Sequence, residues 1–177
     1  MRLNLLLLFL AFTINSYAQS FAEDSLKNRK SVTEQAREMA AAFLNHDYKT
    51  FIDYTHPRII ELIGNVDDMI SKLQSDSAFT NSILSVSFGK PSNIIANGDL
   101  FQCTLPETTE ILVDKGRLVN QSTLVAISYD GGIHWYFIED AGKTLSELRN
   151  FIPEISDQLV IPTQHKPVLY KKRRNKN

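Results

Sequence analysis

The residues best able to do chemistry lie together at positions 53 to 56. Asp53, Tyr54 and His56 place a carboxylate, a phenol and an imidazole within four residues. Imidazole titrates close to neutral pH, so this trio can act as an acid–base site. On a helix, however, positions 53 and 56 share one face while position 54 points elsewhere, and polar groups at helix ends often satisfy free backbone groups. The pattern therefore predicts either a structural role, which we favour, or catalysis.

The sequence gives no sign of a metal or cofactor site. Its four histidines are spread along the chain without a His-x-x-x-His or comparable ligand pair (His46, His56, His134 and His165). Zinc sites need such closely spaced ligands. Phosphate-binding loops and the Gly-x-Ser-x-Gly nucleophile elbow are also missing. Cys103 is the only cysteine and lies in an alternating strand pattern, so we expect it to be a buried, unreactive thiol.

Residues 128–135 (SYDGGIHW) match the Asp-box pattern Ser-x-Asp-x-Gly-x-x-Trp, except that His134 stands where threonine is usual. Asp130 can accept hydrogen bonds from turn amides, and the two glycines permit positive φ angles. Trp135 can pack beneath the turn. One copy of the pattern cannot build a propeller, which needs several blades. The motif therefore predicts a braced hairpin and says little about activity.

The elements that must position these residues change in type near Asp76. A capping box at Ser31–Glu34 is followed by apolar residues at helical spacing from Val32 to about Asn45. Three shorter helices follow, and their expected caps and breaks are Asp47, Pro57, Gly64 and Asn65.

After Asp76 the pattern alternates as in strands. The expected strands are residues 83–88, 94–96, 99–113, 118–129 and 133–138, joined by tight turns that include Asn97-Gly98. Residues 143–151 predict a short closing helix, and the remainder is expected to lie extended over the surface. Helices followed by an antiparallel sheet predict an α+β domain, with the N-terminal helices packed on one face of the sheet.

Three stretches resemble the NTF2-like superfamily, also called cystatin-like or SnoaL-like. Residues 36–48 (AREMAAAFLNHDY) are similar to its opening helix, residues 51–73 (FIDYTHPRIIELIGNVDDMISKL) to its second helix and a His-Pro step, and residues 127–139 (ISYDGGIHWYFIE) to a late strand pair. The resemblance implies helices that line a cone closed by a curved antiparallel sheet, in an exported bacterial member. The family includes isomerases, dehydratases, cyclases and binding or dimerising modules, so the resemblance does not select an activity.

The first 18 residues read as a cleaved signal peptide. Arg2 precedes an apolar stretch over residues 3–12, and Ser16-Tyr17-Ala18 ends in the small-x-small pattern that signal peptidase recognises. The apolar stretch is too short for a membrane-spanning helix, which needs about 20 residues. We expect cleavage after Ala18 and a periplasmic or extracellular protein. The expected organisation is a signal peptide (1–18), a flexible segment (19–30), one NTF2-like domain (31–165) and a basic, disordered tail (166–177).

Charge is distributed unevenly along the chain. Residues 166–177 contain six basic and no acidic residues, whereas residues 19–165 contain 12 basic and 20 acidic residues. The basic tail can contact anionic envelope surfaces, although a solvated, disordered terminus is the interpretation we favour. No aromatic residues interleave the basic run at Lys171–Arg174 to stack on bases, so we expect no nucleic-acid partner.

Aromatic residues on the expected sheet, without a catalytic signature, indicate binding. The candidate ligand-binding residues are Phe88, Phe101, Tyr129, Trp135 and Phe137. We expect a non-enzymatic exported domain that binds a small apolar ligand or a protein partner, in a cone-shaped pocket or on its sheet face, with a homodimer through the open sheet face as one form. The alternatives are an isomerase- or hydrolase-type enzyme using Asp53, Tyr54 or His56, and an envelope-associated structural protein.

Overall fold

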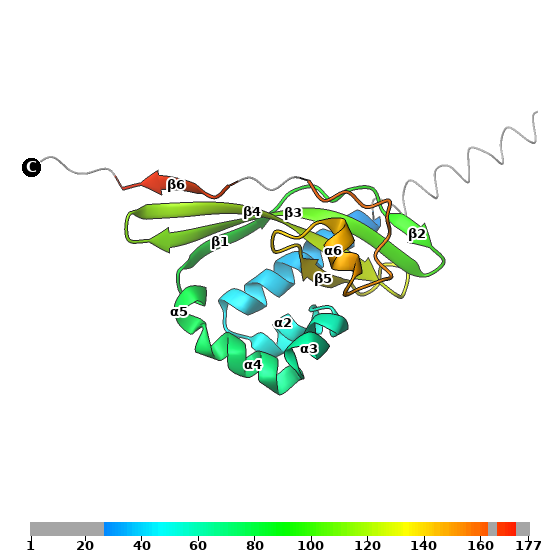
Figure 1. Cartoon of the computed structure of the whole chain (residues 1–177), viewed down its shortest axis with the longest axis horizontal. Coiled ribbons are helices and arrows are strands. Elements are labelled where there is room, and N and C mark those ends of the chain that lie inside the picture. The colour runs from blue at the N-terminus through cyan, green and yellow to red at the C-terminus, as the bar shows by residue number, and fades with distance from the viewer. Residues whose placement is uncertain (1–26, 163–165, 173–177) are drawn as a thin grey trace, which may run out of the picture.

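The computed structural model describes residues 27–162 and 166–172 of the 177-residue chain (Figure 1). The predicted signal peptide (1–18), residues 19–26, His165 and the end of the basic tail (173–177) lie outside the described residues. Within the described part, no helix is long and apolar enough to cross a membrane. The chain has an α+β fold, in which helices pack on an open antiparallel sheet of six strands.

The first helix occupies residues 27–44 of the described chain and lies along one face of the sheet (Figure 1). Its predicted apolar stripe is confirmed, since Val32, Ala36 and Met39 are buried in the core beneath the sheet. The predicted start at Ser31 is wrong, and so is the flexible segment for residues 27–30, which are already helical. Inside a helix Ser31 has no free amide to cap, and its hydroxyl instead donates to the Gly132 carbonyl at 3.2 Å.

Four short helices follow and lie below the first helix in Figure 1. They are α2 (Tyr48–Asp53), α3 (Pro57–Ile63), α4 (Val66–Ser75) and α5 (Ser77–Thr80). The predicted caps are confirmed: the Asp47 side chain accepts from the Thr50 amide at 3.2 Å, and the Asn65 side chain from the Asp68 amide at 3.0 Å. Gly64 ends α3 with a φ of 139°, a conformation that favours glycine. The one-turn helix α5 was not predicted.

The sheet is built on one long hairpin. Strands β3 (Leu100–Val113) and β4 (Gly116–Ser128) pair along their whole length through a two-residue turn. The free edge of β3 pairs with β1 (Ile83–Phe88) and β2 (Ile95–Asn97), and that of β4 with β5 (Tyr136–Glu139) and β6 (Val168–Lys171). The first five strands lie close to their predicted positions.

The strand predicted from residue 133 begins only at Tyr136, because the Asp-box turn holds the preceding residues. Asp130 Oδ1 accepts hydrogen bonds from the amides of Ile133 at 3.0 Å and His134 at 2.9 Å, and from the Ser128 hydroxyl at 2.7 Å. Gly131 and Gly132 have φ angles of 73° and 91°, and Trp135 is fully buried beneath the turn. The predicted brace is therefore confirmed in each of its parts.

Part of the basic tail that was predicted to be disordered forms a strand. Residues Val168–Lys171 form β6, which pairs with Gly116–Val119 of β4, and the Lys172 amide donates to the Lys115 carbonyl at 3.1 Å. All four β6 side chains are exposed, so the strand is held by backbone pairing rather than by burial. Because backbone pairing at a sheet edge requires no apolar alternation, the sequence pattern could not reveal it.

The second face of the sheet is also covered, which the sequence did not predict. Helix α6 (Leu145–Arg149) begins with a capping box between Thr144 and Glu147. The chain after it was expected on the surface, but it turns back over the sheet. Leu148, Ile152, Ile155 and Leu159 are buried there against Val125, Ile127 and Ile138. The face on which a dimer was predicted is therefore open only where α6 and the segment after it leave the sheet uncovered.

Candidate ligand-binding cavity

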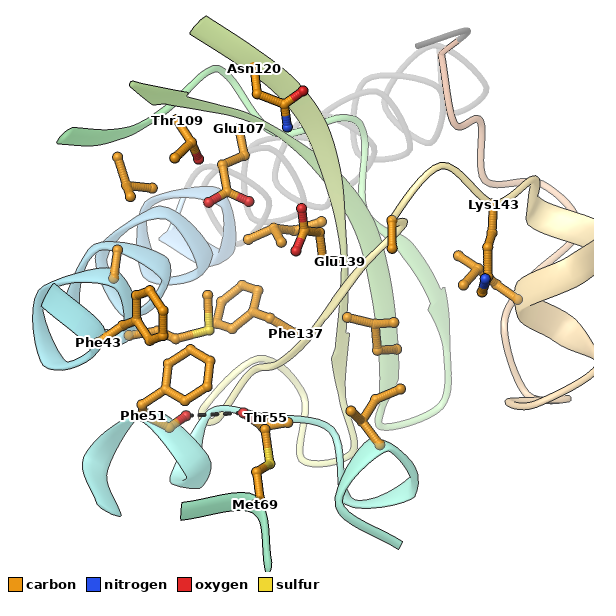
Figure 2. Close-up of a pocket in the computed structure, with 18 of the residues that line it drawn as sticks. Phe43, Phe51, Thr55, Met69, Glu107, Thr109, Asn120, Phe137, Glu139 and Lys143 are labelled. Atoms are coloured by element: carbon orange, nitrogen blue, oxygen red, sulfur yellow. Dashed lines mark hydrogen bonds between the residues drawn. The ribbon is translucent and has the colours of Figure 1, made fainter. Parts of the chain in front are cut away.

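A cavity of about 710 Å³ lies between the helices and the inner face of the sheet. Its walls come from the first helix, α2 to α5, strands β1, β3, β4 and β5, and the segment that contains α6 (Figure 2). Most of the lining is apolar and includes Met39, Phe43, Phe51, Met69, Leu124 and Phe137. This volume is in the range of small-molecule sites and far exceeds the voids of a packed core.

The strand register explains why the cavity opens where it does. Cys103, Leu105, Leu124 and Ala126 pack against the first helix and fill the space beneath the sheet. Side chains on one face alternate, so the next inward positions on β3 are Glu107 and Thr109. Beyond Leu105 the sheet therefore presents polar side chains to the space in front of the helix, and the apolar core stops there.

Glu107 and Glu139 share this inner face. Glu107 is opposite Ser122 in the register, and Glu139 is opposite Leu124, two residues further along β4. Figure 2 shows their carboxylates pointing toward each other within the cavity. The buried Ser122 hydroxyl donates to Glu107 Oε2 at 3.3 Å, and it also favours the charged form of Glu139. The two acids thus meet around one hydroxyl group.

This environment disfavours charge on both acids. Burial, followed by the charge of Glu139, raises the pKa of Glu107 to about 7. Burial within the site also raises the pKa of Glu139, although its side chain is the more exposed of the two. None of the four ion pairs found among the described residues includes either acid. Lys143 also lines the cavity, but it is exposed and lies well apart from both carboxylates in Figure 2.

The candidate trio at positions 53 to 56 does not form one site. The Tyr54 hydroxyl donates to Glu38 Oε2 at 2.6 Å, and its ring stacks on His134 with centroids 5.4 Å apart. The hydrogen bond to Glu38, followed by burial, raises the pKa of Tyr54 to about 12. The Asp53 side chain is exposed, and its backbone carbonyl bonds to His134 Nε2. None of the three residues lines the cavity.

His56 bonds to a different set of partners. Its Nδ1 accepts from the Arg58 amide at 3.2 Å, so the ring caps α3 and carries its proton on Nε2. That proton is directed to the Tyr129 hydroxyl, 2.8 Å away, which in turn donates to Glu154 Oε1 at 2.9 Å. Burial lowers the pKa of His56, so its neutral form is favoured. These contacts give His56 a structural role at the start of a helix.

Of the five predicted ligand-binding aromatics, Phe137 alone lines the cavity. Trp135 is fully buried in the core, and Phe88 and Phe101 pack against the same core. Tyr129 lies elsewhere, against His56 and Tyr136. The residues that sequence reasoning missed are Glu107 and Glu139. A signal for both was present in the sequence. Each acid interrupts an apolar alternation at an inward position, Glu107 two residues after Leu105 and Glu139 two residues after Phe137.

The single cysteine and the metal-ligating side chains of the described residues do not form a further reactive centre. Cys103 is fully buried, and burial raises the pKa of its thiol to about 12, so it is not a nucleophile at neutral pH. Among the described residues, no group of three or more histidine, cysteine, aspartate or glutamate side chains is placed to hold a metal ion.

No protein-family model, curated protein or solved structure matches this chain. Its function must therefore be inferred from the residues that line the cavity.

Proposed function

We propose that this protein is a non-enzymatic binding domain that holds a small, mainly apolar ligand in the cavity between the first helix and the sheet. The observation that carries the proposal is the cavity itself, about 710 Å³ in volume and walled largely by aliphatic and aromatic side chains. Apolar walls of this kind are unfavourable surfaces for water. A bound apolar ligand that displaces the water is therefore stabilised by the hydrophobic effect.

A recess of this kind favours a small ligand over a protein partner. Phe43 and Phe51 of the lining lie within the cavity, whereas Phe79 and Phe151 are 55% and 42% exposed (Figure 2). A homodimer stays part of the proposal only where the outer face of the sheet is open, near the exposed Leu84 and Leu112. Membership of the NTF2-like superfamily is likewise a proposal, supported by helices and a sheet that enclose a cavity. Export rests on the signal-peptide pattern of residues 1–18.

The alternative of an enzyme using Asp53, Tyr54 or His56 is less well supported. Tyr54 and His56 bond to different partners, and all three residues lie outside the cavity lining. Acid–base chemistry at Glu107 is a second candidate, because a carboxyl whose pKa is about 7 can transfer protons near neutral pH. In the envelope-associated alternative, Lys171 is held in β6 with its side chain exposed, so it stays available to an anionic surface.

Titration with a neutral apolar dye, N-phenylnaphthylamine, tests the proposal. The dye fluoresces when it enters an apolar site, and we expect saturable binding with one dye per chain. Ala40 is the place to block the site, because it lines the cavity on the first helix and is 8% exposed. Ala41, the next residue on the same helix, is exposed and provides a matched control.

We expect Ala40→Trp to abolish dye binding and Ala41→Trp to leave it unchanged. Far-ultraviolet circular dichroism establishes that both variants are folded. Equal dye binding by the two folded variants, or no saturable binding by the unmodified protein, would contradict the proposal.

A further inference from the structure

We propose that the ligand is an amphiphile whose protonated amine binds between the carboxylates of Glu107 and Glu139 while its apolar body lies against the aromatic wall. The inference rests on the proposed function, because it names the class of ligand that the same cavity takes. It goes beyond that function in assigning a role to two acids of the cavity that form no ion pair in the described chain.

The lining divides the cavity into a polar and an apolar end. In Figure 2 Glu107, Glu139, Thr109 and Asn120 gather at one end, and Phe43, Phe51 and Phe137 lie toward the other. A ligand that satisfies both ends has a polar head and an apolar body. The head group must complement two carboxylates, an amide and a hydroxyl group.

The charge of the polar end selects a cation. Two adjacent carboxylates without a cationic partner are costly in a site partly withdrawn from water. Neither acid takes part in an ion pair of the described chain, and Lys143 lies apart from both (Figure 2). A bound ammonium group would supply the missing positive charge.

The hydrogen-bond donors of the site lead to the same conclusion. The Ser122 hydroxyl interacts with both acids, but a hydroxyl group has one proton to donate. Thr109 lines the same end of the cavity, and its hydroxyl is a second donor that favours the charged form of Glu107. An ammonium group carries three donors and no acceptor, so it can bond to both acids at once.

The groups that face Glu107 make its charge sensitive to pH. Glu139 and Asp140 add negative charge from β5 and the residue after it. The lining side chains of the first helix, α2, α4 and β1 are uncharged, and Lys143 near α6 is the cation of the lining. Because the pKa of Glu107 is about 7, the acid is mainly ionised above this pH. Amine affinity should therefore rise with pH through about 7, until the amine loses its own proton.

Three ligands of equal chain length test the inference: decylamine, decanol and decanoic acid. Each is titrated against the dye-loaded protein, and its affinity is obtained from displacement of N-phenylnaphthylamine. At about pH 8 we expect decylamine to bind about tenfold more tightly than decanol, as for a charge-assisted hydrogen bond. Decanoic acid should bind most weakly because its carboxylate is repelled. At about pH 5, where Glu107 is protonated, the advantage of decylamine should shrink.

Two variants and a control locate the head group. Glu107→Gln and Glu139→Gln should each lower decylamine affinity about tenfold at about pH 8 and leave decanol affinity unchanged or higher. Glu110 lies on β3 beside these residues but on the other face of the sheet, where it pairs with Arg117 at 2.8 Å. Glu110→Gln removes the same charge from the protein and should leave both affinities unchanged.

The outcomes separate the inference from the proposed function. If the dye binds but decylamine binds no more tightly than decanol at about pH 8, the cation site is overturned and the apolar cavity stands. The inference is also overturned if Glu110→Gln reduces decylamine affinity as much as the two cavity variants do. If the dye shows no saturable binding, the proposed function itself has failed.

Discussion

The Nε2 atom of His56 lies 2.8 Å from the hydroxyl oxygen of Tyr129 and joins the start of α3 to the residue that follows β4. The Tyr129 hydroxyl in turn donates a hydrogen bond to Glu154, which lies in the segment that covers the second face of the sheet. His56 is 3% exposed, whereas Tyr129 is 45% exposed. The buried His56 imidazole is thus held by the accessible Tyr129 phenol. Removing the phenol oxygen therefore tests this one hydrogen bond.

Removing the Tyr129 hydroxyl should destabilise the fold. In Tyr129→Phe the buried His56 donor loses its acceptor, and we expect the free energy of unfolding to fall by about 1–2 kcal/mol. Denaturant unfolding followed by the fluorescence of Trp135, the only tryptophan, measures the change. Tyr170→Phe on β6 removes a hydroxyl from an exposed ring and should change stability by less than about 0.5 kcal/mol. Equal effects in the two variants would show that the His56 link contributes nothing.

His56 should also make the fold less stable in acid. Its folded pKa lies below the ordinary value of 6.5, so between these two values the unfolded chain binds more protons than the folded one. The His56 contribution to stability is therefore complete above about pH 7 and decreases as the pH falls through about 6.5.

Comparison with His56→Asn isolates this contribution. Asparagine keeps a side-chain acceptor at the N-cap of α3 but does not titrate. Unfolding free energies of both proteins, measured between about pH 5 and pH 8, should converge as the pH falls, because only the unmodified protein loses the His56 contribution. A constant difference over this range would exclude an acid-sensitive role for His56.

The sequence correctly predicted the features that depend on residues close together in the chain, such as helix caps and turns. Asp47 and Asn65 cap their helices and the Asp-box residues brace their turn, because each of these interactions joins groups a few positions apart. The sequence did not predict the contacts between segments that are far apart in the chain. Nothing near Ile155 indicates that it covers β4, and nothing near His56 indicates a bond to a residue 73 positions away. The trio at positions 53 to 56 seemed a unit because it is compact in sequence, but its side chains leave the backbone in different directions.

Removing the Glu107 charge should stabilise the ligand-free protein. The folded pKa of about 7 lies above the ordinary value of 4.5, so between these values the folded chain holds a proton that the unfolded chain has released. The favourable contribution of the protonated form is complete below about pH 4.5 and is lost as the pH rises through about 7. At about pH 8, Glu107→Gln should therefore raise the free energy of unfolding by about 1–3 kcal/mol.

Glu110→Gln is the matched control for this gain, because it removes a carboxylate that is already paired with Arg117. It should leave stability unchanged or slightly lower. A variant that gains stability and loses amine affinity identifies Glu107 as a residue kept for binding. If Glu107→Gln is less stable than the unmodified protein at about pH 8, the charge of Glu107 is part of the folded framework.

The Asp-box turn should depend strongly on one side chain. Asp130→Ala removes the acceptor of two backbone amides and of the Ser128 hydroxyl, and we expect a loss of about 2 kcal/mol. Asp114→Ala, in the exposed turn between β3 and β4, removes the same side chain from a turn without such a network and should cost less than about 0.5 kcal/mol. Denaturant midpoints compare the two variants, and a loss as small in Asp130→Ala as in Asp114→Ala would show that the turn forms without its brace.

The cavity acids illustrate how the candidate site could have been found and was not. Cys103, Leu105 and Glu107 occupy successive inward positions of β3, so the alternation alone predicts an inward carboxylate. What it cannot predict is that Glu139 reaches the same space, because this depends on the register between β4 and β5. The alternation along one strand can therefore identify Glu107 as an inward carboxylate, but its proximity to Glu139 follows only from the pairing of the strands.

The most direct test of the central claim uses the methionines. The chain has three, and both of those in the described part line the cavity, Met39 from the first helix and Met69 from α4. With the methionine methyl groups labelled with carbon-13, N-phenylnaphthylamine is added and the methyl resonances are followed by NMR. We expect the Met39 and Met69 resonances both to shift and to saturate together, because both side chains line the cavity that the aromatic dye would fill. Saturable dye binding that leaves both resonances unmoved would place the ligand elsewhere and contradict the proposed cavity site.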